Sequence, residues 1–153
     1  MIRQIVRWPS RLLQVASQPV GRFDERLIQL ASDMHATMTL LGGIGISAVQ
    51  VGVPINMIVI GTGVLKDELW ALVNPRIIKE AGTQTSREGC LSFPRSEWNR
   101  PIKRALRIVV EYQDLDGNLQ RVKAHGLLAA CLQHEIDHLN GTLFINKTTT
   151  TEK

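Results

Sequence analysis

Apolar residues recur at steps of three and four between residues 24 and 41, the spacing of one face of an α-helix. The positions are Leu27, Leu30, Ala31, Met34, Met38 and Leu41. Gly42 and Gly43 follow, and glycine accepts the left-handed backbone that commonly ends a helix. The pattern predicts an amphipathic helix from Asp24 to Leu41.

Short runs of β-branched and aliphatic residues, separated by turn residues, predict strands further along the chain. We expect them at residues 57–60, 71–73, 76–78 and 143–145. Asn74-Pro75 is interpreted as a turn between two of them. Residues 106–113 and 119–123 flank Asp116-Gly117, a pair that favours tight turns, and this predicts a β-hairpin.

A second helix is predicted from Gly126 to Leu139, where the chain is apolar almost all round. Such a helix is expected inside the core rather than on the surface. Asn140-Gly141 ends it. Because the strands are grouped and mostly antiparallel, we predict the α+β class, with antiparallel sheets packed around this central buried helix.

The composition is that of a globular protein, with 44% hydrophobic and 21% charged residues. The 153 residues fit one domain over 1–153, with 148–153 as a flexible tail. No stretch approaches the roughly 18 apolar residues of a membrane span, and no signal peptide is recognisable, so a cytoplasmic location is expected. The formal charge is +4, but the basic residues are scattered, which favours an ordinary surface over a nucleic-acid interface.

The second helix carries His134-Glu135-Ile136-Asp137-His138. Residues four apart lie on the same helix face, so His134 and His138 can bind one ion while Glu135 reaches a bound water. The plainer interpretation is a pair of hydrogen-bonded histidines. The match on an otherwise apolar helix favours a metal site, and a hydrolase is one use of it.

Two histidines need a third ligand, and the only acid after His138 is Glu152 in the tail. Cys131 lies about 7–8 Å along the helix axis from an ion shared by the histidines, which a metal–sulfur bond of about 2.3 Å cannot span. We interpret Cys131 as a buried, inert thiol. Cys90, in a glycine-containing loop, completes a Cys-His-His set with the fourth position open to water. As a bare nucleophile, Cys90 would need a histidine as its base, and both good candidates serve better as ligands.

The glycine-rich segment 42–50 follows a helix and lacks the third glycine of a dinucleotide fingerprint. We interpret it as a loop whose backbone pairs with an extended peptide. Gln50 would then offer a side-chain N–H to a developing oxyanion, a donor worth about 2.7–4 kcal/mol in the transition state.

Three segments together resemble the peptide deformylase family. Its hallmarks are a Gly-x-Gly-x-Ala-Ala-x-Gln loop, a Glu-Gly-Cys-Leu-Ser loop and a His-Glu-x-x-His helix. The matching segments here are 43–50, 88–92 and 134–138, in the same order and at similar spacings. The likeness extends from about Ile5 to Ile145. The combination is highly specific, whereas any one loop would not be.

The resemblance implies a single catalytic domain that removes the N-formyl group from the N-terminal methionine of newly synthesised proteins and releases formate. The implied metal ligands are Cys90, His134 and His138. Metal-bound water would be the nucleophile, with Glu135 as general base and then acid. Gln50 and the backbone N–H of Leu91 would form the oxyanion hole.

The resemblance also implies a substrate site. Its residues would be Ile44, Gly45, Gly89, Leu91, Leu127 and Ala130. Backbone groups near Ile44, Gly45 and Gly89 would align the peptide, and the methionine pocket would be lined by Ile44, Leu91, Leu127 and Ala130. The implied partners are N-formylmethionyl nascent peptides, bound by a monomer.

Ligand preference alone suggests zinc for one sulfur and two nitrogens. The family works best with Fe²⁺, which Zn²⁺, Ni²⁺ or Co²⁺ can replace.

Ser47 stands where the family has alanine, and we expect its hydroxyl to bond to local backbone. The chain ends soon after Ile145, without the C-terminal helix associated with ribosome docking, so only a weak ribosome association is expected. A metallopeptidase or other amidase on this scaffold, and a non-enzymatic metal-stabilised module, are the alternatives.

Overall fold

The computed structural model describes residues 1–61 and 68–147. The main elements are α1 (Glu25–Leu40), β1 (Gly45–Ser47), β2 (Met57–Ile60), β3 (Trp70–Ala81), β4 (Gln84–Glu88), β5 (Arg100–Arg104), β6 (Arg107–Gln113), β7 (Leu119–His125) and α2 (Gly126–Leu139). Short 3-10 helices lie at Arg11–Gln14, Ala48–Val51, Arg95–Glu97 and Phe144–Lys147. The predicted tail, residues 148–153, lies outside the described residues.

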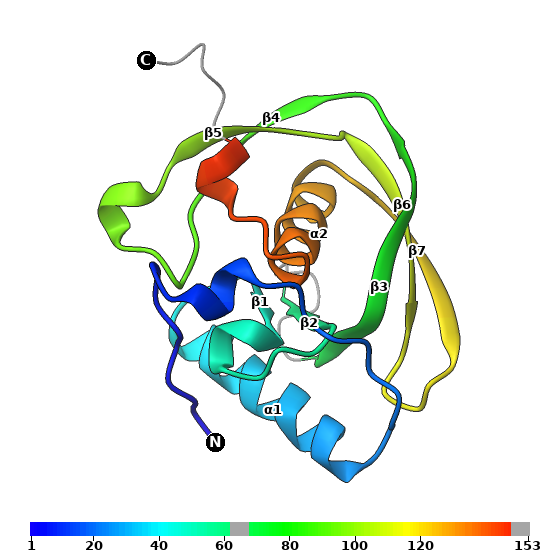
Figure 1. Ribbon diagram of the computed structural model, residues 1–153. Coiled ribbons are helices and arrows are strands. Elements are labelled where there is room, and N and C mark those ends of the chain that lie inside the picture. The colour runs from blue at the N-terminus through cyan, green and yellow to red at the C-terminus, as the bar shows by residue number, and fades with distance from the viewer. Residues whose placement is uncertain (62–67, 148–153) are drawn as a thin grey trace.

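The strands form two antiparallel sheets on different sides of α2. One has the order β1-β2-β3-β6-β7, and the other pairs β4 with β5. Figure 1 shows α2 in the middle of the molecule, with β3, β6 and β7 along one side, β4 and β5 across the top, and α1 below. The predicted α+β class with a central buried helix is therefore confirmed.

The first helix forms where its apolar stripe predicts it. The Asp24 carboxylate accepts hydrogen bonds from the N–H groups of Arg26 and Leu27 at 3.1 and 3.2 Å, which caps the helix start. The predicted stripe is buried from Leu27 to Met38 against β1 and β2. Gly42 has a φ of +72°, so the left-handed end of the helix is also as predicted.

The turn predicted at Asn74-Pro75 is wrong, because β3 runs through it as one strand. The pairing of β3 with β6 shifts register between Val73 and Arg76, and this irregularity accommodates a proline that has no N–H for the ladder. The Asn74 side chain forms hydrogen bonds with neighbouring segments at this irregularity. It accepts from the N–H of Val20 at 2.8 Å and donates to Gln113 Oε1 at 2.8 Å.

The strand predicted at residues 143–145 is also wrong, since the chain forms a 3-10 helix at Phe144–Lys147. A three-residue apolar run does not distinguish the two structures, and its burial decides the outcome. Phe144 is 1% exposed and packs edge-on against Phe93, with ring centroids 5.0 Å apart. The sequence also did not indicate β4 and β5, whose polar residues lack a clear alternation, and part of the predicted loop 42–50 is strand β1.

The predicted hairpin is present as β6 and β7, which pair in register from Arg107–His125 to Gln113–Leu119. Its turn is longer than two residues. The Asp114 carboxylate accepts from the N–H groups of Asp116 and Asn118, and Gly117 takes a φ of +86°. Strand β7 leads directly into α2, so the hairpin sets where the buried helix begins.

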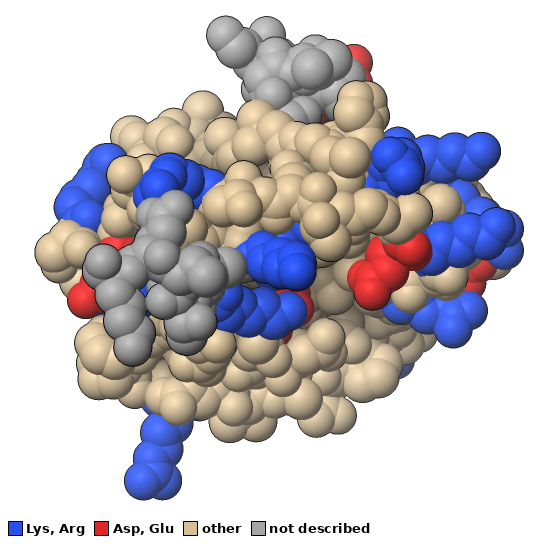
Figure 2. Space-filling view, turned by 90° about the horizontal axis from the view of Figure 1, so that it is seen from above, with Lys and Arg blue, Asp and Glu red and all other residues tan. Residues whose placement is uncertain are grey.

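The face of the molecule seen in Figure 2 carries its basic residues in separate groups. On the face seen from above, Lys and Arg side chains are divided by uncharged residues rather than gathered in one patch (Figure 2). Within residues 1–61 and 68–147, no helix combines the length and apolar character that crossing a bilayer demands.

Candidate metal centre and active site

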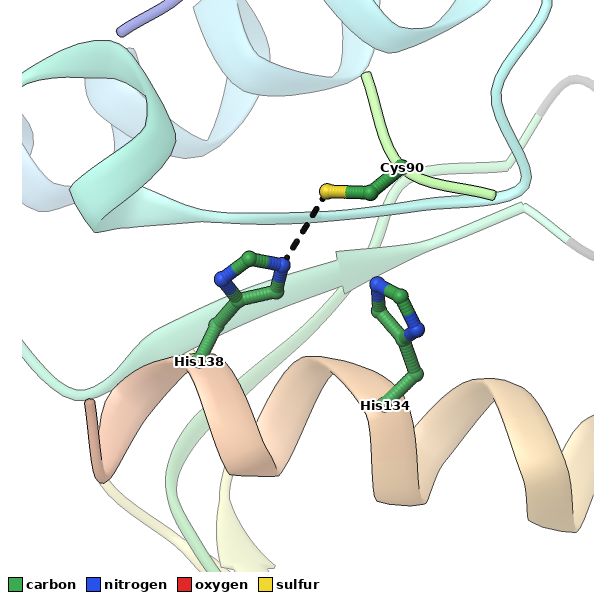
Figure 3. Close-up of side chains that lie close together, drawn as sticks. All are labelled: Cys90, His134 and His138. Carbon is green, nitrogen blue, oxygen red and sulfur yellow. Dashed lines mark hydrogen bonds between the residues drawn. The ribbon is translucent and has the colours of Figure 1, made fainter. Parts of the chain in front are cut away.

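The three predicted metal ligands meet in the core. His134 and His138 lie one turn apart on α2, with ring centroids separated by 5.1 Å. Cys90, in the loop after β4, approaches them from the other side, and its Sγ lies 3.2 Å from His138 Nε2 (Figure 3). One ligand atom from each residue lies within 4.8 Å of the others.

This cluster fits a metal ion of tetrahedral preference. Bonds of about 2.3 Å to sulfur and 2.0–2.1 Å to nitrogen place tetrahedral ligand atoms about 3.3–3.6 Å apart, close to the observed sulfur–nitrogen separation. All three residues are at most 7% exposed, so water does not compete freely for them. One sulfur and two imidazole nitrogens form a catalytic ligand set when the fourth position is left to water or substrate.

The loop carrying Cys90 is held by packing on both sides. The ring of Phe93 stacks on Trp8 at 5.6 Å and meets Phe144 at 5.0 Å. Before the cysteine, Gly89 lies against Trp98 so closely that a Cβ atom would come within 2.3 Å of the indole ring. Any side chain at residue 89 would therefore displace the tryptophan or the loop.

Glu88 orients the first histidine. Its Oε1 lies 2.8 Å from His134 Nδ1. Two further contacts, of 2.9 and 2.6 Å, join its carboxylate to Arg104, which also donates to Asp137 at 2.6 Å. Because a carboxylate only accepts, Nδ1 carries the hydrogen, and Nε2 is left to face the ligand cluster. The contact between Glu88 and His134 was not predicted from the sequence.

The protonation of the cluster follows from these partners. Burial alone would raise the pKa of Glu88, but Arg104 and His134 outweigh it and lower that pKa to about 2. Burial alone would lower the pKa of His134, but hydrogen bonds to Cys90 and Glu88 raise it to about 10. Burial lowers the pKa of His138 well below its usual range. A metal ion must therefore displace a proton from His134 to bind.

Glu135 lies beside the ligands with a free carboxylate oxygen. Its Oε1 is buried and has no hydrogen-bond partner among the described residues. Burial raises its pKa to about 7, although the charge of His134 opposes this. A Cβ atom added at Gly45 would lie 2.9 Å from Glu135 Oε2, so the strand passes directly over this carboxylate. A buried group that titrates near neutrality can both take and return a proton.

Gln50 reaches the cluster from the 3-10 helix after β1. Its Nε2 lies 3.4 Å from Cys90 Sγ and 3.1 Å from Ser92 Oγ. Its Oε1 accepts from the backbone N–H and the hydroxyl of Ser47, at 2.9 and 3.1 Å. The Ser47 hydroxyl also faces the backbone N–H of Gln50 in a capping box, so the expected bond to local backbone is present together with an unpredicted contact to the Gln50 side chain. Leu91 is half-buried next to Cys90, and the part of its backbone N–H in an oxyanion hole stays a prediction.

A cavity of about 400 Å³ opens beside Glu135, His134 and Cys90. Five of the predicted substrate residues line it: Ile44, Gly45, Gly89, Leu127 and Ala130. Leu91 is not among its lining residues. Leu127 is 63% exposed, although it belongs to the buried helix, because it lies at the helix start where the cavity meets solvent.

Comparison with known proteins decides the family. A sequence model described as polypeptide deformylase matches residues 2–153. The chain belongs to this family. It is 40% identical to the peptide deformylase of Helicobacter pylori (strain G27) over 149 residues, covering 94% of this chain and 84% of that protein. With the peptide deformylase of Mesorhizobium japonicum it shares 44% identity over 149 residues, covering 95% and 83%.

Solved deformylases have the same fold. A crystal structure of a peptide deformylase from Legionella pneumophila superposes with a TM-score of 0.92 at 38% identity, covering 99% of this chain and 88% of that one. The Thermotoga maritima deformylase gives 0.91 at 35% identity, covering 97% and 99%. The predicted family and enzyme class are therefore confirmed, and the family and fold support deformylation of N-formylmethionine.

Sequence reasoning missed part of this deformylase cavity. Ser86, Arg87, Trp98 and Asn99 line it without a motif to indicate them. They come from β4 and from the segment before β5, two strands that the apolar pattern did not indicate. Ser92 was visible as the last residue of the Glu-Gly-Cys-Leu-Ser loop, but its contact with Gln50 depends on the fold.

Cys131 is buried beside the cavity but lies outside the ligand cluster found among the described residues. Its Sγ lies 3.6 Å from the carbonyl oxygen of Ile44. Burial, with the charge of Glu135, raises the pKa of its thiol well above the usual range. A neutral, hydrogen-bonded thiol agrees with the prediction of an inert cysteine.

Proposed function

We propose that this chain hydrolyses the formyl amide at the N-terminal methionine of newly synthesised proteins, releasing formate and a free amine. The observation that carries the proposal is the placement of Cys90, His134 and His138 within 4.8 Å of one another, beside Glu135 at the wall of a cavity. Residues 1–153 act as one catalytic domain in this proposal.

The metal would be held by Cys90, His134 and His138. When bound, such an ion polarises the formyl carbonyl and lowers the pKa of a water ligand from 15.7 toward about 7. The ligand set also accepts zinc, nickel or cobalt, but we propose Fe²⁺ in the cell because the family resemblance favours it. Glu88 keeps the ring of His134 in the orientation that ligation needs.

Glu135 moves the proton. It accepts one from the attacking water as the new carbon–oxygen bond forms, and its buried carboxylate can hold it because its pKa is raised to about 7. It then donates the same proton to the methionine nitrogen as the carbon–nitrogen bond breaks. Gln50 Nε2–H and the backbone N–H of Leu91 stabilise the oxyanion between these two events.

The peptide lies along the β1 segment and the loop before Cys90. Backbone groups near Ile44, Gly45 and Gly89 align it, and the lack of side chains at both glycines supports a close approach. The methionine side chain enters the cavity, beside Leu127 and Ala130. Leu91 and Ile44 complete the apolar wall in this proposal.

The partners follow from the substrate. N-formylmethionyl nascent peptides are the proposed ligands, and we place the enzyme in the cytoplasm as a monomer, away from membranes. Association with the ribosome would be weak at most, and the dispersed basic groups on the face in Figure 2 are consistent with this.

Formate release from a formyl-Met peptide tests the proposal directly. Protein is prepared without oxygen and loaded with iron, and metal content is measured on the same sample. We expect formate release, and at least about a 100-fold loss in Glu135→Ala with the metal retained. No release by the iron-loaded wild type would overturn the proposal. Faster cleavage of the unformylated peptide would instead favour a metallopeptidase.

A further inference from the structure

The Gln50 side chain is held at both ends of its amide group. On the oxygen side, Ser47 provides two donors, its backbone N–H at 2.9 Å and its hydroxyl at 3.1 Å. On the nitrogen side, Ser92 Oγ lies 3.1 Å from Nε2. Gln50 is 1% exposed, Ser92 is 1% exposed and Ser47 is fully buried, so water does not take over these contacts.

These contacts determine which way the amide points. A backbone N–H can only donate, so the atom facing the N–H of Ser47 must be the oxygen of Gln50. Nε2 therefore faces the metal cluster, and Ser92 occupies one of its two hydrogens. The other is directed at Cys90 Sγ, 3.4 Å away. A sulfur atom is a weak acceptor, so this N–H remains available to an oxygen anion that develops beside Cys90.

We propose that Ser47 and Ser92, together called the Gln50 clamp, are positioning residues for the oxyanion hole. The clamp aims one N–H of Gln50 at the reacting carbonyl, and the Ser47 hydroxyl polarises the amide by bonding to its oxygen. A preorganised donor stabilises the transition state more than one that must first be oriented. The inference deepens the proposed function and rests on it, because it requires an oxyanion at this site.

Ser47→Ala is a mild way to weaken the clamp. It removes the hydroxyl but keeps the backbone N–H, and the family resemblance places alanine at this position. Losing one neutral hydrogen bond corresponds to about a threefold to tenfold loss of rate. We expect that loss in kcat, with KM changed by less than about twofold, because the bond acts on the transition state. Ser92→Ala should act in the same direction.

A double-mutant cycle shows whether the hydroxyl acts through Gln50. Gln50→Ala alone should lower kcat about 100-fold to 1,000-fold. Adding Ser47→Ala to that variant should lower kcat by less than about 1.5-fold, because the group it orients is gone. The same threefold to tenfold loss in both backgrounds would contradict the clamp. Ser17→Ala, the same change at a buried serine outside the cavity, is the matched control and should leave kcat unchanged.

A measurement on metal-free protein checks the clamp without turnover. The Gln50 side-chain amide should give two separate NMR signals, identified by their loss in Gln50→Ala, that exchange slowly with water. Ser47→Ala should shift these signals and speed their exchange, whereas Ser17→Ala should not. Unchanged signals in Ser47→Ala, together with unchanged kcat, would overturn the clamp alone. Absence of formate release by the wild type would instead overturn the proposed function.

Discussion

Replacing Glu88 by glutamine removes one negative charge from beneath the metal ligands while keeping the size of the side chain. The carboxylate accepts two hydrogen bonds from Arg104 and one from His134, and it is 8% exposed. Glutamine has a single acceptor oxygen, so it cannot serve both partners equally. Among the described residues, Arg104 would keep its ion pair with Asp137, at 2.6 Å.

The pKa of Glu88 sets the size of the effect. Lowering it from 4.5 to about 2 corresponds to about 3 kcal/mol of preference for the charged form in the folded protein. We therefore expect Glu88→Gln to lower the free energy of unfolding of the metal-free protein by about 2–3 kcal/mol near pH 7. The loosened His134 ring should weaken metal binding about tenfold to 100-fold.

The pH dependence has a definite sign. A carboxylate whose pKa is lower in the folded state stabilises that state above its unfolded pKa. The difference in stability between wild type and Glu88→Gln should be complete above pH 4.5 and shrink as the pH falls toward 2. A stability difference that grows on acidification would refute the assignment of this charge.

Urea unfolding of chelator-treated protein gives the stability, and competition with a coloured chelator gives the metal affinity. Glu111→Gln is the control, because Glu111 also pairs with two arginines, Arg76 and Arg121, but does so on the exposed face of the sheet. It should leave metal affinity unchanged. Metal affinity in Glu88→Gln within twofold of the wild type would refute the proposed support of His134.

Three other predictions concern the same site. In the formate-release assay, Gly45→Ala should lower kcat about tenfold to 100-fold, because the new methyl group would lie 2.9 Å from Glu135 Oε2. Gly21→Ala is the control and should have no effect, because open space surrounds Gly21. Chelation should abolish formate release, and retained turnover without metal would contradict the metal centre. Readdition of metal to a hundred times its Kd should raise the free energy of unfolding by about 2.7 kcal/mol, as measured by urea titration. In a Cys90→Ser variant, Cys131 is the remaining thiol, and its raised pKa predicts that a thiol reagent modifies it only after unfolding, as followed by mass spectrometry. Rapid modification of the folded variant would show that this thiol is reactive.

Local spacing along the chain was enough for the two helices and for two of the three metal ligands. His134 and His138 are four positions apart, and a helix has 3.6 residues per turn, so the two rings share a face in any fold that keeps the helix. The same helical rise is sufficient to exclude Cys131 as a ligand of their ion. The hairpin of β6 and β7 was predictable because turn residues lie between two apolar runs.

Long-range pairing decided the rest. Cys90 reaches His138 because Phe93, in the same loop after β4, packs against Trp8 and Phe144, and no local pattern records that packing. The contact between Glu88 and His134 joins residues 46 positions apart, and those between Gln50 and Ser92 join residues 42 apart. The packing of β4, the Cys90 loop and the 3-10 helix at Ala48–Val51 around α2 sets such distances, and local propensity does not.

Local sequence pattern and tertiary packing therefore determined different parts of this protein. The amino-acid sequence by itself determined the buried helix with its paired histidines, since hydrophobic periodicity and helical rise act over a few residues. Only the tertiary structure decided that Asn74-Pro75 continues a strand, that residues 144–147 form a 3-10 helix, and that Ser47 contacts the Gln50 side chain. The outcomes at Asn74 and Ser47 depend on which partner is left for each buried polar group once the sheets have closed around the helix. The 3-10 helix at 144–147 follows from the burial of Phe144.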